Sequence, residues 1–446
     1  MRKIILFFSV CVFISCSGTK RSGSNDRVIK PNPRTNTNTS KVQKGTGAVD
    51  TIRWTEIDRT NEYNDKIENI DLDKRASYSV ALFLPFELEG SNVNDANDED
   101  SKLGRFTQYY AGVKLALNTL NDEGINIKVD VYDAESGSFD NKLRSCKNAD
   151  VIIGPRNTDQ LKTTANFGKV NEIPVISPWK SGTKLTKENP YFIQLQTSQK
   201  DHYIKIVEHA KSEFDDDQIF ILSRKVNKDM RYMNYIQSVG RALNADNSSE
   251  KPFNEYFIEE DSLRIGDTAF DSIFYEDKTS VFILPNWSFL DDEEFIYNTV
   301  RKMSGEKGLK DVVFYGMPIL IESDKIKFEH YRNLRMRIVR SSYVDKSIEE
   351  SKAFMKKFYE NYAGFPTDEA YEGYDAMMFV GRQLNQYGKK FQYFLDQYQG
   401  SLLQTEFDVQ KIFDQSSGDK FDNIQYFQNR HLYILKFEND KFELDK

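Results

Sequence analysis

The chain has 446 residues, which is more than one hydrophobic core usually serves, so we expect two lobes. Charged residues make up 29% of the sequence and hydrophobic residues 39%, as is ordinary for a globular protein. The formal net charge is −8. This acidic balance argues against a protein that binds nucleic acid or anionic lipid through a basic surface.

The first sixteen residues have the pattern of an export signal. Arg2 and Lys3 form a positive n-region, and residues 4–14 form an apolar segment too short to span a bilayer. Phe13-Ile14-Ser15-Cys16 resembles the lipobox of bacterial lipoproteins, in which the cysteine is acylated after cleavage. We therefore expect a signal peptide at residues 1–15 and lipidation, such as palmitate, on Cys16. The protein would then be lipid-anchored to the outer or inner membrane and face the periplasm. An ordinary secretory signal is the alternative.

The next segments are polar. Residues 16–50 contain almost no large apolar side chain, so we expect a flexible tether. Residues 51–77 are expected to form an extended arm on the body, or a disordered segment anchored by Trp54. Cys146 has no partner for a disulfide within the mature chain and is expected to be a packed or half-buried thiol without a catalytic role.

From Tyr78 the sequence alternates between short apolar runs and helical patterns. The apolar runs are typical of strands buried on both faces of a parallel sheet. In the first half we expect strands at 78–85, 125–133, 151–155 and 173–178, and a helix at 106–120.

The second half repeats this pattern, beginning near Ser198. The acidic run 291–294 is expected to stabilise the start of a helix rather than to act in catalysis. We expect strands at 218–223, 281–285, 312–318 and 336–343, helices at 203–210, 230–243, 291–303, 348–363 and 368–387, and a hairpin at 431–437 and 441–444.

Six segments, in this order, resemble the type I periplasmic solute-binding proteins, the group of the leucine/isoleucine/valine-binding proteins. The resemblance implies an α/β fold of two Rossmann-like lobes with parallel sheets, joined by a three-strand hinge and closing around a ligand. It further implies that residues 78–197 and 345–404 form lobe 1, and that 198–344 and 405–446 form lobe 2. The matching segments are 110–116, 121–125, 151–155, 173–178, 189–192 and 371–376.

In that family, small ligands are held by the loops that follow the strands. Arg156 and Lys180 would make this cleft basic, which favours a small polar or anionic ligand. Met317 stands where amino-acid-binding members carry an acidic residue. Trp179 could instead cap the core and Lys180 could be merely solvated. The ligand-binding residues implied by the resemblance are Arg156, Asn157, Thr158, Trp179, Lys180, Ser181, Asn286, Trp287 and Met317.

The sequence offers no support for an enzyme. It contains no GxSxG, GxGxxG or phosphate-loop pattern and no metal-ligand spacing, so we expect no cofactor and no metal. His202 and His209 lie seven residues apart on one predicted helix, and we attribute them to a shared solvated face.

Two functions remain open. In the first, the protein is a solute-binding lipoprotein that works with a permease of an ABC transporter or in sensing. In the second, it is an envelope lipoprotein that regulates peptidoglycan synthesis by contacting a cell-wall synthase, as lipoproteins of the same fold are thought to do.

Overall fold

The computed structural model describes residues 70–86, 96, 98, 101–244, 250–398, 402–413 and 424–445. All of these lie in one compact unit, Asp58–Lys446. The expected signal peptide, Cys16, the tether and residues 51–69 of the expected arm lie outside the described residues. Residues 70–77 form no helix or strand, and Ile70 and Leu72 pack against a hydrophobic core of the first lobe.

The first lobe is built on a seven-stranded sheet with the order β11-β12-β5-β4-β3-β1-β2. β11 pairs antiparallel to β12, and the other neighbouring strands pair in parallel. On β1, Val80 pairs with Val129 on one side and with Val151 on the other. The strands are β1 (Tyr78–Leu84), β2 (Ile127–Asp133), β3 (Val151–Ile153), β4 (Val175–Ser177), β5 (Phe192–Gln194), β11 (Val409–Phe413) and β12 (Ile424–Asn429).

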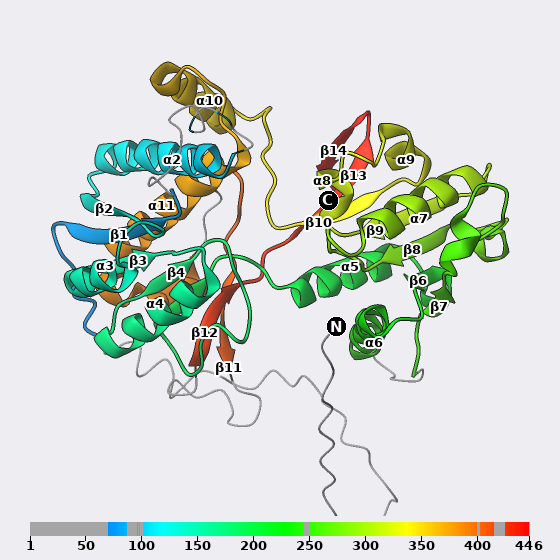
Figure 1. Cartoon of the computed structure of the whole chain (residues 1–446), viewed down its shortest axis with the longest axis horizontal. Coiled ribbons are helices and arrows are strands. Elements are labelled where there is room, and N and C mark those ends of the chain that lie inside the picture. The colour runs from blue at the N-terminus through cyan, green and yellow to red at the C-terminus, as the bar shows by residue number, and fades with distance from the viewer. Residues whose placement is uncertain are drawn as a thin grey trace, which may run out of the picture. The chain divides into compact units, whose positions relative to one another are not determined.

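Helices cover both faces of this sheet, as Figure 1 shows for α2 and α11 on one face and α3 and α4 on the other. Successive residues of β1 explain this, because Val80 and Leu82 face one core while Ala81 and Phe83 face the other. The helices are α2 (Lys102–Asp122), α3 (Phe139–Ser145), α4 (Thr158–Asn171), α10 (Glu349–Tyr362) and α11 (Asp368–Tyr387).

The second lobe has its own seven-stranded sheet, with the order β14-β13-β10-β9-β8-β6-β7. The strands from β10 to β7 are parallel, whereas β13 and β14 add an antiparallel hairpin. The strands are β6 (Ile219–Ser223), β7 (Asn254–Phe257), β8 (Ser280–Leu284), β9 (Val312–Gly316), β10 (Arg337–Arg340), β13 (Tyr433–Glu438) and β14 (Lys441–Leu444).

The helices of the second lobe are α5 (Gln199–Glu213), α6 (Asn227–Leu243), α7 (Glu293–Glu306), α8 (Ile319–Glu322) and α9 (Phe328–Asn333). Short 3₁₀ helices lie at Cys146–Asn148, Asp216–Gln218, Glu260–Leu263, Asp271–Ile273 and Gly388–Gln397. Among the described helices, none has an apolar stretch of the length needed to traverse a bilayer.

The chain passes between the two sheets three times. The connections are residues 195–198 between β5 and α5, 341–348 between β10 and α10, and 430–432 between β12 and β13. The fold is thus α/β, with two Rossmann-like lobes of mainly parallel sheet joined by three crossovers.

The sequence-based division of the C-terminal part requires a correction. We expected residues 405–446 to return to the second lobe, but β11 and β12 belong to the first sheet and only β13 and β14 to the second. The error arose because the apolar residues of β11 and β12 are interspersed with Gln, Lys and Asn, so neither strand was predicted.

α2 and α11 pack closely because each carries a glycine at the contact. A Cβ on Gly112 would lie 1.9 Å from the carbonyl oxygen of Ala370, and one on Gly373 would lie 2.1 Å from that of Tyr109. This close approach fixes the N-terminal turns of α11, which carry Glu369 and Glu372, beside α2.

Candidate functional site

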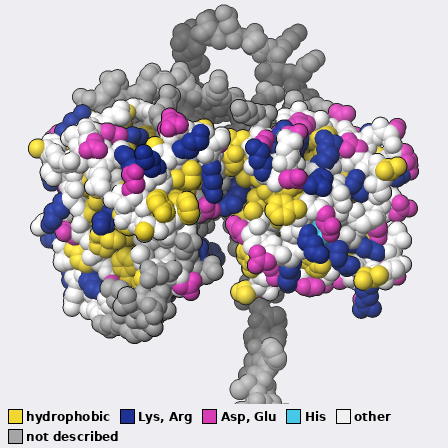
Figure 2. Space-filling model, turned by 90° about the horizontal axis from the view of Figure 1, so that it is seen from above, with side chains coloured by type: hydrophobic (Ala, Val, Ile, Leu, Met, Phe, Trp, Pro, Cys, Tyr) yellow, Lys and Arg dark blue, Asp and Glu magenta, His cyan; other side chains and the backbone are white. Residues whose placement is uncertain are grey.

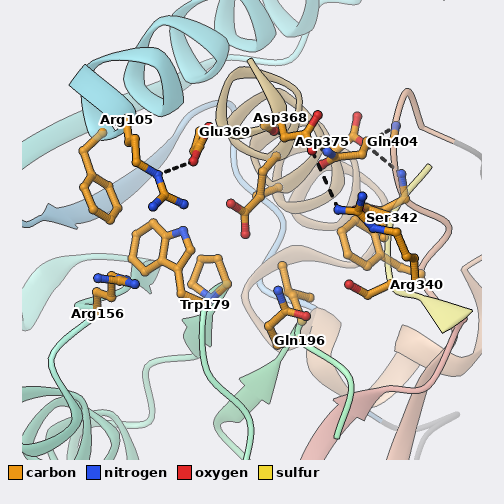
Figure 3. A pocket seen from close by; sticks show the side chains of 18 of the residues that line it. Arg105, Arg156, Trp179, Gln196, Arg340, Ser342, Asp368, Glu369, Asp375 and Gln404 are labelled. Carbon is orange, nitrogen blue, oxygen red and sulfur yellow. Dashed lines mark hydrogen bonds and ion pairs between the residues drawn. The ribbon is translucent and has the colours of Figure 1, made fainter. Parts of the chain in front are cut away.

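A cavity of about 720 Å³ lies where the carboxyl ends of the first-lobe strands meet α2, α11 and the crossovers. In Figure 3, Arg156, Trp179 and Arg105 lie toward one side of this cavity, and Arg340, Ser342 and Gln404 toward the other. Residues that are far apart in the sequence therefore line this cavity, as is expected of a ligand site between two lobes.

The loop from β3 to α4 supplies the first predicted residue. Gly154 has φ +81°, and a Cβ there would lie 2.6 Å from the carbonyl oxygen of Phe83 and 3.1 Å from the Trp179 ring, so glycine is required. Asn157 caps α4, because its side-chain oxygen accepts hydrogen bonds from the backbone N–H groups of Asp159 and Gln160. This loop presents the exposed Arg156 guanidinium 5.8 Å from the centre of the Phe106 ring.

The loop after β4 supplies Trp179, which forms an aromatic wall of the cavity. Its ring centre lies 5.4 Å from that of Phe106 and 5.0 Å from that of Tyr109. The loop is held by two further contacts, from the Ser181 hydroxyl to the Thr197 carbonyl oxygen (2.9 Å) and from Lys180 Nζ to Thr158 Oγ1 (2.7 Å). Lys180 thus binds the first residue of α4 and is not directed freely at a ligand.

Most charges around the cavity are paired with one another. Arg105 Nε lies 2.5 Å from a carboxylate oxygen of Glu369, and Arg340 Nη2 lies 3.8 Å from Asp368 and 4.0 Å from Glu322. Arg156 differs, because no carboxylate of the described residues lies within ion-pair distance of it. Figure 2 shows basic and hydrophobic side chains gathered in the middle of the face seen from above.

Four acidic residues of α11 line this cavity and were not predicted, namely Asp368, Glu369, Glu372 and Asp375; the last two have strongly raised pKa values. Burial and, to a smaller extent, repulsion by Glu369 raise the pKa of Glu372 to about 8, while a hydrogen bond from Trp179 acts in the opposite direction. Burial raises the pKa of Asp375 to about 7, although the backbone N–H groups of residues 403–405 all donate to its carboxylate. The motif 371–376 was a visible sequence signal, but it did not show that these side chains face the cavity.

A second cavity, of about 310 Å³, adjoins the first and shares Trp179, Gln196, Glu322, Arg340 and Ser341 with it. Its other lining residues include three that come from the second lobe, the predicted Trp287 and two that were not predicted as site residues, His202 and Pro318. The rings of His202 and Trp287 meet edge to face, with their centres 4.6 Å apart.

His202 and His209, which we had assigned to a shared solvated face, do not lie on one, and this corrects our interpretation. His202 is buried, and burial lowers its pKa to about 4. His209 is half-buried, and its Nδ1 lies 2.9 Å from the Tyr315 hydroxyl. α5 thus turns both histidines toward the protein rather than toward water.

Five of the nine predicted residues line neither cavity: Lys180, described above, and Met317, Asn286, Asn157 and Thr158. Met317 is fully buried in the second-lobe core, and Asn286 is 1% exposed. Both amide atoms of Asn286 have no hydrogen-bond partner among the described residues. Asn157 caps α4, and Thr158, the first residue of that helix, accepts a hydrogen bond from Lys180. Of the nine predicted residues, the structure therefore brings Arg156, Trp179, Ser181 and Trp287 to the cavities.

His209, Glu213 and Asp445 lie close enough together to suggest a metal site. However, Arg337 binds both carboxylates, with Nε 2.8 Å from Asp445 and Nη2 2.8 Å from Glu213. The cluster is an ion-pair network in which the Arg337 guanidinium already offsets part of the negative charge of the two carboxylates. Cys146 is buried as expected, and burial raises the pKa of its thiol, which disfavours a reactive thiolate.

The two-lobed sheets, the three crossovers and the cavity beside them define the type I periplasmic binding protein fold. The family model "Receptor family ligand binding region" matches residues 86–211. A comparison with curated protein sequences gives no significant match.

Solved structures show the same fold. A protein described as a branched-chain amino acid ABC transporter from Rhodospirillum rubrum superposes with a TM-score of 0.56 at 12% identity, over 83% of this chain and 100% of that one. A branched-chain amino acid ABC transporter periplasmic ligand-binding protein from Burkholderia xenovorans gives 0.51 at 12% identity, over 83% and 94%. LpoA from Haemophilus influenzae gives 0.52 at 10% identity, over 86% of this chain but only 62% of that one. At such identities the likeness establishes the fold alone.

Proposed function

We propose that the protein is a lipid-anchored, extracytoplasmic solute-binding protein that closes on a small polar or anionic ligand by hinge motion. It would serve uptake or sensing and carry out no chemical step. The three crossovers support hinge closure, since few backbone segments need to change conformation when the lobes move. The branched-chain amino acid binding proteins of the same fold support a ligand related to amino acids.

The observation that carries this proposal is the exposed guanidinium of Arg156, which forms no ion pair with the described residues. It is exposed at the cavity, and the neighbouring cations are already paired, Arg105 with Glu369 and Arg340 more loosely with Asp368. A guanidinium presents a planar set of donors that fits a carboxylate or phosphate. Trp179 and Phe106 beside it supply an apolar surface for the remainder of the ligand.

The test is a thermal-shift screen of the purified protein against amino acids, nucleotides and muropeptides. A ligand that binds the folded state raises the melting temperature, and Arg156→Gln should remove this shift for anionic ligands. Arg231→Gln is the matched control, because Arg231 is exposed on α6 and lines neither cavity. An equal shift in both variants would exclude Arg156 as the anchor.

The second candidate is an envelope lipoprotein that regulates peptidoglycan synthesis through protein contacts. The pairing of most cleft charges favours it, since such a cleft is electrostatically satisfied without a ligand. The fold shared with LpoA is compatible with it. If no compound of the screen shifts the melting temperature and affinity capture recovers a cell-wall synthase, this second function replaces the first.

A further inference from the structure

The smaller cavity has a composition that differs from that of the larger one. Trp179 from the first lobe and Trp287 from the second both line it, together with Thr197 and His202. Among its lining residues the charged pair Glu322 and Arg340 lies at the border with the larger cavity, because both residues line the two cavities. The smaller cavity is therefore a compartment with aromatic walls and few charges.

Both tryptophans are held in place before any ligand arrives. Trp179 is fixed by its ring contacts with Phe106 and Tyr109. Trp287 is fixed by the His202 ring and by the loop that follows it, because the backbone N–H of Ser288 donates to the carboxylate of the buried Asp292 (3.1 Å). Rigid aromatic walls bind a ring at a low cost in conformational entropy.

Two uncharged polar groups of the compartment, those of Thr197 and His202, have unused hydrogen-bonding capacity. Thr197 is 5% exposed, and its hydroxyl has no partner among the described residues. His202 Nδ1 lies 2.9 Å from the carbonyl oxygen of Ser198, an arrangement that places the proton on Nδ1 and leaves Nε2 as an acceptor. A buried hydroxyl without a partner costs free energy, which a ligand hydroxyl would recover.

We propose that this compartment binds a neutral hydroxylated ring, that is, a sugar unit of the ligand. The C–H faces of such a ring pack on indole rings, while its edge hydroxyls reach Thr197, His202 and the Glu322–Arg340 pair. That pair is spaced at 4.0 Å and offers a donor and an acceptor side by side, as vicinal hydroxyls require. The volume of about 310 Å³ admits one ring. This inference rests on the proposed function and adds the class of ligand.

The experiment is an equilibrium titration of tryptophan fluorescence and of heat with N-acetylglucosamine, glucose and galactose, using the purified protein. At least one sugar should bind with a Kd below about 1 mM and shift the emission. Trp287→Phe and Thr197→Val should each weaken binding at least about 10-fold without lowering the melting temperature. Trp54→Phe, at the third tryptophan of the chain, should leave the emission shift unchanged.

Two results would overturn the inference. One is the absence of binding by all three sugars. The other is binding that Trp287→Phe and Thr197→Val leave unaltered. Adenosine is included because a flat nucleobase also stacks on indole, and binding of adenosine without any sugar would likewise contradict it. The proposed function fails separately, when the charged ligands of the thermal-shift screen give no shift that depends on Arg156.

Discussion

Arg430 donates from Nε to the carboxylate of Asp201 at 2.9 Å, and this ion pair joins the third crossover to the first turn of α5, directly after the first crossover. Asp201 lies in the first turn of α5 and also accepts hydrogen bonds from Ser198, in the first crossover, and from Gln428 of β12 at 2.8 Å. Arg430 lies in the third crossover. One buried carboxylate thus connects the start of the second lobe to β12 of the first sheet, at the place where a hinge would bend.

Replacing this carboxylate should weaken the crossover region. Asp201→Asn keeps the size of the side chain but removes its charge, leaving Arg430 and Gln428 with a poorer acceptor. We expect a loss of about 1–3 kcal/mol in the free energy of unfolding, measured by urea denaturation. Arg430→Gln should cost less, because the Arg430 side chain is 37% exposed. A double-mutant cycle with no coupling between the two sites would show that the pair does not stabilise the fold.

The contact between α2 and α11 should not tolerate a methyl group. Alanine normally favours a helix over glycine by about 1 kcal/mol, but on Gly112 its Cβ would meet a backbone oxygen at 1.9 Å. We expect Gly112→Ala to lower stability by about 3 kcal/mol, because backbone atoms must move.

Gly305→Ala is the matched control for this contact. Gly305 lies in the last turn of α7 and is exposed, and a Cβ added there would have no other described atom within 4 Å. This change should be neutral or should stabilise by up to about 1 kcal/mol. Equal effects of the two substitutions in calorimetry would contradict the close packing of α2 and α11.

The loop that carries Trp287 should depend on Asp292. This fully buried carboxylate is 2.5 Å from Arg224 and 3.0 Å from Lys228. Burial opposes its ionisation, but the hydrogen bonds from Lys228 and Arg224 outweigh burial and lower its pKa. The pKa of Asp292 is lower in the folded state than in the unfolded state. Its carboxylate therefore stabilises the folded state near neutral pH, and this stabilisation is lost on acidification.

We therefore expect Asp292→Asn to cost about 2–4 kcal/mol at neutral pH and less at acidic pH, measured by denaturation at both pH values. Glu294→Gln, on the exposed side of the same helical turn, should have little effect. A cost that stays constant with pH would contradict the role of the ionised carboxylate.

The proposed lipid anchor gives a prediction for localisation. Cys16→Ala removes the only thiol at the expected cleavage site, so the protein should move from the membrane pellet to the soluble fraction of the envelope. Cys11→Ala is the control, because it lies within the expected signal peptide and should leave pelleting unchanged. Continued pelleting of the Cys16 variant would exclude anchoring through this residue.

The sequence predicted best the elements that are buried on both faces. β1, β6, β8 and β9 were found because nearly every residue in them is apolar, as a central parallel strand requires. α4 was not found, because its 14 residues contain few large apolar side chains and bury only Leu161, Thr164, Ala165 and Gly168.

The site was predictable only in part, for a geometric reason. Arg156 and Trp179 follow adjacent strands, so the carboxyl edge of the sheet brings them together. Met317 also follows a strand, but its side chain turns into the core, and the position of a strand end does not reveal that direction. Glu372 and His202 lie on helices. Only the packing of these helices in the folded protein brings the two side chains to the cavities, so the sequence pattern did not reveal them.

Glu372 should make stability depend on pH in the opposite sense to Asp292. Its folded pKa, raised to about 8 by burial and by Glu369, lies above the ordinary value of 4.5, so between these pH values the folded state binds more protons than the unfolded state. Stability attributable to this group therefore falls as pH rises from about 5 to about 8.

Glu372→Gln removes the titration while keeping the size of the side chain. The variant should gain on the order of 2 kcal/mol relative to the unaltered protein between pH 5 and pH 8, less than the full shift implies because Glu372 is only half-buried. Asp375 titrates in the same range, but it is present in both proteins, so the difference between their urea-denaturation curves isolates Glu372. Parallel pH profiles would show that Glu372 is ionised throughout, in which case it would present a fixed negative charge to the ligand beside Trp179.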